Sequence, residues 1–422
     1  MSKAPAALPG LLPNQDRPLA GRVTQSEMRV ANLSLLLRQV HAFGGRSRAQ
    51  LAAATGLSKA TTSSLIADLV ERGLVKEGKP MKDGAVGRPG TSVRLDGARV
   101  TGVGLEIGIG YLTLTAVTLN GQVLRESVIP IDTLHLEVET VLERVAHHLG
   151  QTLSSLRESG VQVVGVTVSP PGVIDYGSQT VRFAPNLGWY GVPIVSELTR
   201  RLGEGTPPLS LENDAKLAAL SEYNRYARQG VRDLLYLSGQ VGIGAGIISE
   251  GRLVRGWLGA SGEVGHMPLD PDLTPCNCGR RGCWETVVGL NAFLELATRE
   301  GDGLRDPSRP IEDRMMAIRS LADAGDERVL SAINTITERL GVGIGILVDV
   351  LNPRVVVLGG YFAHLGELIL QPLSELLESR RMTEVRTELA TSRLGLMSAA
   401  RGGALLALEH VLDDPTIVPV SA

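Results

Sequence analysis

Aromatic residues and long apolar runs are scarce in this sequence, and each shortage excludes a class of function. Phe, Trp and Tyr make up 3% of the 422 residues, which argues against an RNA or single-strand surface on which bases stack. No uninterrupted apolar run reaches about 18 residues, so no membrane span is expected. Residues 1–23 lack a basic start followed by an apolar core, and we expect a mobile tail there instead of a secretory signal.

Cysteine is equally rare, and its placement is informative. All 3 cysteines form one C-x-C-x4-C motif, and a histidine precedes the first of them by ten residues. Three thiolates and one imidazole make the closed tetrahedral shell of a structural zinc ion. Three buried free cysteines are the alternative, but cysteine occurs nowhere else, and without a secretory signal a disulfide is the weaker explanation. The predicted zinc ligands are His266, Cys276, Cys278 and Cys283.

Charge is divided unevenly along the chain. Residues 1–100 hold 15 Lys and Arg against 7 Asp and Glu, a balance of +8, and the remainder holds 42 − 15 = 27 against 45 − 7 = 38, a balance of −11. With 43% hydrophobic and 21% charged residues the chain is typical of soluble globular proteins, and its length predicts more than one domain. A basic front end on an acidic body suggests a nucleic-acid-binding module joined to a second domain.

Residues 24–97 carry the pattern of a winged helix-turn-helix. Apolar residues recur at helical spacing from 26 to 43, Ser47 and Gln50 form a capping box for a short second helix, and a third helix spans 58 to 72. Two short strands, 74–77 and 92–95, then flank a basic loop that fits a wing. A solvated three-helix bundle is the alternative.

The third helix begins with small polar residues, as a recognition helix requires where it meets base edges and phosphates. Its apolar face, which would hold it on the domain, is predicted to be Leu65, Ile66, Leu69 and Val70. Two basic side chains of the loop are placed to touch phosphate or enter a minor groove. The predicted DNA contacts are Ser58, Lys59, Thr61, Thr62, Ser63, Lys82 and Arg88.

The motif G-E-x-G-H at residues 262–266, followed by C-x-C-G-x-x-G-C-x-E at 276–285, resembles the signature of the ROK family of repressors and sugar kinases. The resemblance implies that the histidine and cysteines bind a structural zinc, and that Glu263, His266 and Glu285 line a sugar pocket. Carboxylates accept hydrogen bonds from sugar hydroxyls. A histidine bound to the metal through one nitrogen can offer the other to the sugar.

Two further segments resemble the sugar side of this family. Glu212-Asn213-Asp214-Ala215 is similar to the E-N-D-A segment of ROK kinases, which implies that Asn213 binds the sugar and Asp214 is the general base. An aspartate that caps the following helix is the plainer alternative. Asn186, in a loop before Trp189, is a further sugar ligand by resemblance, and Trp189 either walls the pocket or packs in the core.

The first glycine-rich turn departs from the phosphate loop of sugar kinases, D-x-G-G-T. Glu106 replaces the aspartate, Ile109 the second glycine and Gly110 the threonine. A β-branched side chain blocks the close approach that glycine allows to a phosphate, and the lost hydroxyl removes a donor. We therefore expect weak or no ATP binding, with Asp214 as a vestigial base. Gly289 stands where family members often carry serine, and Arg354 where acidic residues are common.

These patterns together predict an α/β chain, a winged helix-turn-helix followed by the two-lobed, actin-like (ribonuclease-H-like) ROK sugar-kinase fold. The expected parts are a tail (1–23), a DNA-binding domain (24–97), a first lobe (98–218), a second lobe with the zinc motif (219–398) and a helix returning to the first lobe (399–422).

The predicted function is a cytoplasmic transcriptional regulator, most simply a repressor, of the xylose- and N-acetylglucosamine-repressor type. It would bind double-stranded operator DNA, a structural zinc and a monosaccharide or sugar-phosphate effector, as a homodimer or dimer of dimers. An ATP-dependent sugar kinase that keeps a DNA-binding domain is the alternative from another class. A third is a module released from DNA by a partner protein.

Overall fold

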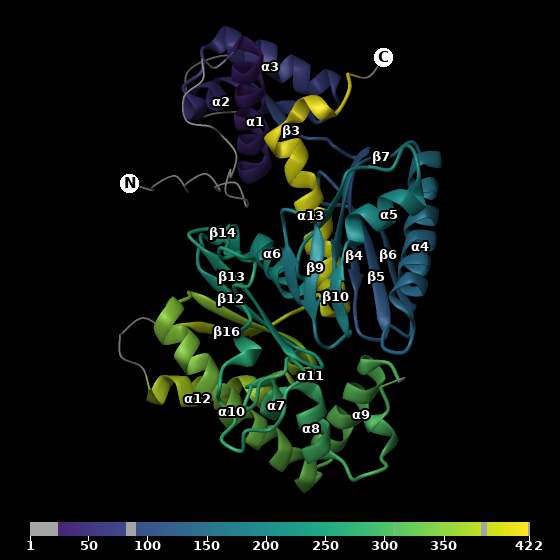
Figure 1. Cartoon of the computed structure of the whole chain (residues 1–422). Coiled ribbons are helices and arrows are strands. Elements are labelled where there is room, and N and C mark those ends of the chain that lie inside the picture. The colour runs from purple at the N-terminus through teal and green to yellow at the C-terminus, as the bar shows by residue number, and fades with distance from the viewer. Residues whose placement is uncertain (1–23, 82–89, 308, 381–385, 421–422) are drawn as a thin grey trace.

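The computed structural model describes residues 24–81, 90–307, 309–380 and 386–420. A small helical head lies at one end, and a body built on two five-stranded sheets lies below it (Figure 1). The first 23 residues lie outside the described part of the chain, as does the segment between the wing strands. This architecture agrees with the fold predicted from the sequence, a winged helix-turn-helix on a two-lobed α/β body.

The head contains three helices and a three-stranded sheet in the order β1-β3-β2. Thr24 and Ser47 each form a capping box at the start of a helix, with Glu27 and Gln50 respectively, as predicted for the second of them. Ser58 caps the third helix. The elements are α1 (Gln25–Phe43), β1 (Arg46–Ser47), α2 (Arg48–Thr55), α3 (Lys59–Glu71), β2 (Val75–Met81) and β3 (Gly90–Leu95).

The first body sheet has the order β11-β7-β4-β5-β6, with β11, β7 and β4 parallel and the others antiparallel. Helices α4 (Val138–Glu158) and α5 (Ile194–Leu202) pack together on one side of it (Figure 1). The strands are β4 (Val100–Ile107), β5 (Tyr111–Thr118), β6 (Val123–Pro130), β7 (Gln162–Ser169) and β11 (Leu209–Leu211). A small antiparallel sheet follows β7: β8 (Val173–Asp175), β9 (Thr180–Ala184) and β10 (Trp189–Val192).

The second body sheet repeats that plan in the order β14-β13-β12-β15-β16, again with three consecutive antiparallel strands beside parallel ones. Its strands are β12 (Leu234–Gly239), β13 (Ile243–Ser249), β14 (Arg252–Leu253), β15 (Val355–Gly360) and β16 (Glu388–Thr391). Its helices are α7 (Glu285–Val288), α8 (Leu290–Ala297), α9 (Ile311–Asp323), α10 (Glu327–Leu351), α11 (Tyr361–Leu365) and α12 (Glu367–Ser379). This repetition of one sheet plan is what the actin-like prediction required.

Two helices, α6 (Asp214–Ala227) and α13 (Ser398–Asp413), pack against each other between the sheets. α13 covers β4 and β7, and α6 covers β12 and β13. The contact with β4 is direct, because a Cβ at Gly102 or Gly104 would lie 2.1 or 1.8 Å from carbonyl oxygens of α13. The lobes are therefore joined through two interlocked helices.

α13 also reaches the head (Figure 1). On α1, Ser34 donates to the carbonyl of Leu412 at 2.7 Å, and Arg38 pairs with Glu409 at 2.9 Å. Leu33, Leu36 and Leu37 of α1 share one apolar core with residues of β4, β7 and α13, including Leu408, Val411 and Leu412. The head is thus packed onto the body and completed by it.

Candidate functional site

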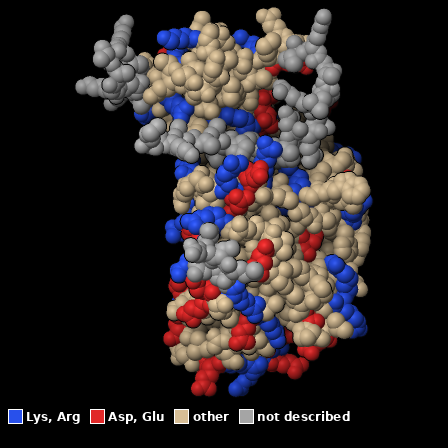
Figure 2. Space-filling view, turned by 90° about the vertical axis from the view of Figure 1, so that its left-hand side faces the viewer, with Lys and Arg blue, Asp and Glu red and all other residues tan. Residues whose placement is uncertain are grey.

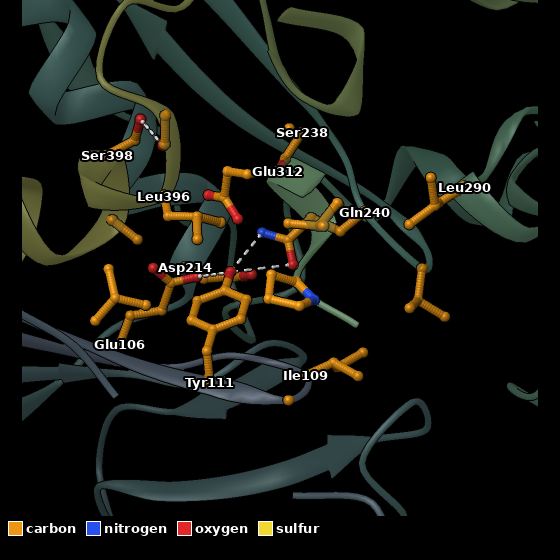
Figure 3. A pocket seen from close by; sticks show the side chains of 18 of the residues that line it. Glu106, Ile109, Tyr111, Asp214, Ser238, Gln240, Leu290, Glu312, Leu396 and Ser398 are labelled. Carbon is orange, nitrogen blue, oxygen red and sulfur yellow. Dashed lines mark hydrogen bonds between the residues drawn. The ribbon is translucent and has the colours of Figure 1, made fainter. Parts of the chain in front are cut away.

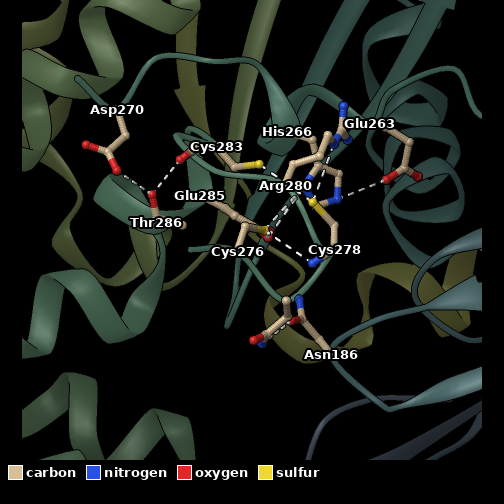
Figure 4. Close-up of polar contacts among 11 residues, drawn as sticks. Asn186, Glu263, His266, Asp270, Cys276, Cys278, Arg280, Cys283, Glu285 and Thr286 are labelled. Atoms are coloured by element: carbon tan, nitrogen blue, oxygen red, sulfur yellow. Dashed lines mark hydrogen bonds and ion pairs between the residues drawn. The ribbon is translucent and has the colours of Figure 1, made fainter. Parts of the chain in front are cut away.

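The predicted zinc ligands come together in space, although they span 18 positions of the chain. The four ligand atoms of His266, Cys276, Cys278 and Cys283 lie within 4.8 Å of one another (Figure 4). The Cys278 and Cys283 sulfurs are 3.7 Å apart, close to the edge of about 3.8 Å expected of a tetrahedron with Zn–S bonds of about 2.3 Å. The donor set and its spacing therefore fit a tetrahedral metal ion.

The two ring nitrogens of His266 face different partners. Nδ1 lies 3.8 Å from the Cys276 sulfur, on the side of the thiols, whereas Nε2 lies 3.7 Å from Glu263 Oε2. Glu285 Oε1 accepts from the Cys276 thiol at 2.8 Å, so this carboxylate borders the cluster as well. One imidazole thus joins the cluster of three cysteines to the carboxylates beside it.

One cavity collects every residue predicted to bind sugar. It lies between the start of α6, the turn between β12 and β13, and the stretch that carries the cysteines. Pro171, Gly172 and Ile109 complete its wall from the first lobe. The six predicted residues that line it are Asn186, Asn213, Asp214, Glu263, His266 and Glu285.

Asn213 and Asp214 are placed by the junction of β11 and α6. Asn213 is the N-cap of α6, where its Oδ1 accepts from the Lys216 amide at 3.1 Å and its Nδ2 donates to the carbonyl of Gly172 at 3.1 Å. The capping role foreseen as the plainer alternative for Asp214 thus belongs to Asn213. Asp214 is the first residue of the helix and lines the cavity.

The turn between β12 and β13 must carry glycine where it passes the cavity. A Cβ on Gly242 would lie 2.5 Å from Glu285 Oε2 and 2.8 Å from Asn186 Nδ2. Asn186 is itself oriented by Asn277, whose Nδ2 donates to its Oδ1 at 3.1 Å. The glycine therefore lets two polar side chains, one from each lobe, converge on the same space.

Burial changes the acid–base properties of this cavity. The pKa of Asp214 and that of Glu263 are both raised by burial. Burial lowers the pKa of Lys216, while nearby Glu212 and Glu263 oppose that shift. The Lys216 ammonium donates to the carbonyl of Gly259 at 2.6 Å, so a fully buried cation stands behind the carboxylates of the cavity.

Sequence reasoning missed this cation and the pair beside it. Arg255 donates to Glu212 at 2.7 Å, and the Tyr176 hydroxyl donates to the same carboxylate at 2.5 Å. Together with Lys216 they hold residues 255–259 against α6 and β8. The glutamate of the E-N-D-A segment, which had no assigned role, was the one available signal.

A second, neighbouring cavity occupies the nucleotide side of the cleft (Figure 3). Glu106 lies at its floor, where Tyr111 and Thr113 donate to its two carboxylate oxygens at 2.9 and 3.0 Å. Burial and the nearby carboxyl of Asp214 raise the pKa of Glu106 to about 8. Glu106 therefore keeps its proton at neutral pH, and both of its oxygens are hydrogen-bonded within the protein, so it is not poised to hold the metal ion that accompanies a nucleotide.

Backbone groups of the first glycine-rich turn are also hydrogen-bonded within the protein. Thr133 accepts from the Gly110 amide at 3.0 Å and donates to the carbonyl of Gly108 at 3.1 Å. The Gly108 amide donates to the carbonyl of Tyr111 at 2.9 Å. The amides of Gly108 and Gly110 are therefore already hydrogen-bonded within the protein.

Packing decides between the two roles considered for Trp189, and it also explains the glycine at position 289. Trp189 is 2% exposed and belongs to the core of the first lobe, so it packs there and does not wall the cavity. Gly289 lies so close to the turn between β12 and β13 that a Cβ would sit 2.7 Å from the carbonyl oxygen of Val241. A serine at this position would therefore displace that turn.

The head presents the start of α3 to solvent. Ser58, Lys59 and Thr61 are exposed, and Ser63 is half-buried. Thr62 is fully buried, which does not fit a contact with DNA, because one turn of helix must turn some residues inward. Val70, expected on the apolar face, is 38% exposed. The predicted contacts Lys82 and Arg88 lie outside the described residues.

Charged side chains of both signs are interspersed over the body on the face shown in Figure 2. On that face no region of one sign extends across the body, whereas the basic excess of the sequence belongs to its first 100 residues. Among the described residues, no helix is both long and apolar enough to cross a membrane.

Comparison with known protein families separates head from body. Residues 102–410 match the ROK family, and residues 34–84 match the MarR family. A putative xylose repressor of Caldicellulosiruptor sp. (strain Rt8B.4) is 30% identical over 396 residues, which cover 92% of this chain and 98% of that protein.

Two solved structures are similar over different extents. A ROK family transcriptional regulator described as a homolog of the E. coli MLC protein superposes with a TM-score of 0.73 at 23% identity, over 93% of this chain and 99% of its own. A ROK family glucokinase from Streptomyces griseus, in complex with glucose and AMPPNP, superposes with a TM-score of 0.60 at 25% identity, over 72% of this chain and 98% of its own. The regulator thus has a similar extent to this chain, whereas the kinase covers less of it.

Proposed function

This chain belongs to the ROK family, and on that premise we propose that it is a sugar-responsive, DNA-binding transcriptional regulator, most simply a repressor. A winged head that resembles MarR proteins, and a relative named as a xylose repressor over nearly the whole chain, support the DNA-binding part. The sugar-responsive part rests mainly on one observation. The six predicted sugar ligands line a single cavity, while the neighbouring phosphate loop is closed.

A structural zinc ion is part of this proposal. The four ligands fit a tetrahedral metal, and the Nδ1 side of His266 would be the metal side. When bound, the ion would fix the histidine ring and the backbone turn between Cys276 and Cys283. His266 Nε2, Glu263 and Glu285 would then be held in position to exchange hydrogen bonds with sugar hydroxyls.

We propose an uncharged monosaccharide as the effector, in preference to a sugar phosphate. Among the described residues that line the cavity there is no Lys or Arg, whereas Asp214, Glu263 and Glu285 contribute carboxyl groups. A phosphate there would be desolvated beside carboxylates, and the Lys216 ammonium behind them already donates to the carbonyl of Gly259. Hydroxyl groups, which both donate and accept, suit such a lining.

The proposed domain roles follow the division drawn from the sequence. Residues 24–97 would bind operator DNA in the cytoplasm, and the lobes 98–218 and 219–398, with helix 399–422, would bind the effector between them. A homodimer would present two heads to a two-fold operator. The exposed stripe Val342, Ile346 and Val350 on α10 offers an apolar face for a second copy.

The decisive experiment is operator binding at fixed salt, using DNA upstream of the protein's own coding region. D-xylose, D-glucose, N-acetylglucosamine and their phosphates are added in turn. One uncharged sugar should shift the affinity tenfold or more, which requires about 1.4 kcal/mol of discrimination between two states. An effect of phosphates alone contradicts the uncharged effector. DNA binding that no sugar alters contradicts the sugar-responsive function and favours a protein partner.

Asp214→Ala tests the proposed sugar response separately from DNA binding. It should remove the sugar response and leave operator affinity unchanged, because Asp214 lies in the body. Asp323→Ala, which removes an exposed aspartate paired only with Arg319 on its own helix, is the matched control. An unaltered sugar response in Asp214→Ala would exclude that side chain from the effector site.

Lys59→Ala tests the head. Lys59 is exposed at the start of α3, and loss of a phosphate contact should weaken binding to most sequences and lower the slope of log affinity against log salt by about 1. Thr62→Val, on the buried side of the same helix, should change neither quantity. If Lys59→Ala also leaves both unchanged, DNA contacts a different surface of the head.

The kinase alternative has one feature in its favour. Asp214, at the start of α6, is a half-buried carboxyl whose pKa is raised by desolvation, which suits a general base. Against it stand the closed amides of the first glycine-rich turn and the buried Glu106. Turnover of ATP with the sugar that releases DNA would establish it.

A further inference from the structure

The two glycine-rich turns face each other across the cleft, and a side-chain bridge joins them (Figure 3). Tyr111, the first residue of β5, comes from the first lobe, and Gln240, in the turn after β12, comes from the second. Gln240 Nε2 donates to the Tyr111 hydroxyl at 3.1 Å, and that hydroxyl donates to Glu106 at 2.9 Å. The three side chains form a continuous chain of hydrogen bonds from one sheet to the other.

The bridge is held rigidly on the first lobe. The ring of Tyr111 lies over Gly108, where a Cβ would come within 2.3 Å of it. Thr113 fixes the other oxygen of Glu106 at 3.0 Å, and Thr133 ties the turn between Gly108 and Gly110. Tyr111, Thr113 and Thr133 are all buried, so these bonds are sheltered from water.

The bridge also borders the proposed effector site. Asp214 and Gln240 each line both cavities. Gln240 is followed by Gly242, which lies against Glu285 and Asn186. A shift of Gln240 would therefore move the turn against which these two predicted sugar ligands are packed.

We propose that Tyr111 and Gln240 form an inter-lobe clasp, and that this protein uses it to hold its effector pocket together without a nucleotide. In a two-lobed kinase, bound substrates draw the lobes together. Here a phenol and an amide occupy the phosphate side and connect the lobes directly. Both are positioning residues. They set the distance between the two halves of the pocket, and the claim that sugar affinity depends on them rests on the proposed function.

The test uses the full-length protein with and without Tyr111→Phe, and reads hydrogen–deuterium exchange in the sugar-free state. The variant keeps the ring over Gly108 and removes only the hydroxyl. Loss of one such bond should speed exchange about fivefold in two places, the turn that contains Gly108 and, across the cleft, the turn 239–243. Tyr223→Phe is the matched control, because the Tyr223 hydroxyl is also buried and has no partner among the described residues.

Faster exchange in 239–243 for Tyr111→Phe and not for Tyr223→Phe supports the clasp. Unchanged exchange there, or an equal change in the control, overturns it. This result needs no sugar and so stands apart from the proposed function.

Binding of D-xylose and D-glucose is then measured for Tyr111→Phe, Gln240→Leu and the double variant. Each single variant should lose affinity about fivefold, and the double variant no more than either one. If the affinity losses of the two single variants multiply in the double variant, the clasp is overturned. If the unmodified protein binds neither sugar, that result counts against the proposed effector alone.

Discussion

The proposed sugar side and the nucleotide side of the cleft meet at the turn between β12 and β13, yet they present opposite chemistry. On the sugar side, Asn186, Glu263 and Glu285 face open space, and Gly242 is kept small to admit two of them. On the nucleotide side, the amides of Gly108 and Gly110 are already bonded within the protein. One half of the cleft is available to a ligand, whereas the other half is satisfied internally.

This difference shows how an enzyme fold can become a sensor. Recognition of sugar hydroxyls needs an open set of donors and acceptors, so that side must remain unsatisfied. Phosphate transfer needs free amides and a metal-binding carboxylate, and these have been absorbed into a hydrogen-bonded network around Glu106. Loss of catalysis therefore need not leave an empty cleft, because internal bonds replace those made to the nucleotide.

The largest expected effect is that of Cys278→Ser on the sugar side. Structural zinc supplies about 10–16 kcal/mol in small zinc-dependent domains, so loss of one ligand should release the metal. Because His266 belongs to both the cluster and the effector cavity, sugar binding should fail as well.

Metal content by mass spectrometry and sugar binding by calorimetry check this together. Operator binding by the head provides the control, since α3 lies far from the cluster (Figure 1). A metal-free variant that still binds sugar would separate the two sites.

On the nucleotide side, Glu106→Gln should change the pH dependence of stability. In the native protein Glu106 binds its proton up to a pH of about 8, because its pKa is raised by burial and by Asp214, whereas in the unfolded chain a glutamate ionises near 4.3. Between these values the native state binds more protons, so the free energy of unfolding falls as pH rises. This destabilisation is fully developed above the native pKa and amounts to a few kcal/mol.

Urea unfolding from pH 5 to pH 9 measures this effect as the difference in the free energy of unfolding between Glu106→Gln and the unmodified protein. Glutamine cannot ionise, so the difference should grow with pH in favour of the variant. Glu312→Gln, which replaces another carboxyl group that lines the same cavity, is the control. A constant difference would place the pKa of Glu106 in its ordinary range.

A smaller effect is expected of Gly242→Ala. The added methyl group would meet Glu285 and Asn186 at 2.5 and 2.8 Å and push them apart, lowering sugar affinity about tenfold if the strain costs about 1–2 kcal/mol. Gly177→Ala is the control, because its nearest neighbour is 3.4 Å away, at Asp175. Undiminished affinity would show that the sugar does not use the space between Glu285 and Asn186.

The smallest effect is expected when the residues of a kinase phosphate loop are restored. Glu106→Asp, Ile109→Gly and Gly110→Thr together restore the residues of a kinase phosphate loop, yet ATP turnover should remain undetectable. Tyr111 and Thr133, which these changes leave in place, still bond to the backbone of the turn. Measurable turnover would mean that the three side chains alone had closed the nucleotide side.

The sequence predicted the elements whose residues lie in continuous motifs. The metal-binding stretch, the E-N-D-A segment and the capped helices of the head each fall within a short window, where spacing predicts contact. The bridge from Tyr111 to Gln240 joins residues 129 positions apart, and no local pattern connects them. The predicted DNA contact at Thr62 does not fit the structure for another reason. A small residue such as threonine can lie on either face of α3, so the helical period did not show that this one is buried.

Packing across the chain explains the remaining gaps. No pattern in the sequence marked Lys216 as buried, because its burial comes from α13 and β13, which both pack against α6. Its burial could be seen only once the sheets were stacked. The C-terminal helix was expected over 399–422 and spans Ser398–Asp413, and a single turn of 3-10 helix, Gly395–Met397, leads into it.

The way α13 completes the head has a consequence for synthesis. The apolar core under α1 includes Leu408, Leu412 and Val418, and Arg72 donates to the carbonyl of Thr416 at 3.3 Å, more than three hundred residues after the helices they support. During translation the head emerges first but lacks these side chains until the body has been made. A nascent chain therefore completes the apolar core of the head only after the body has been made.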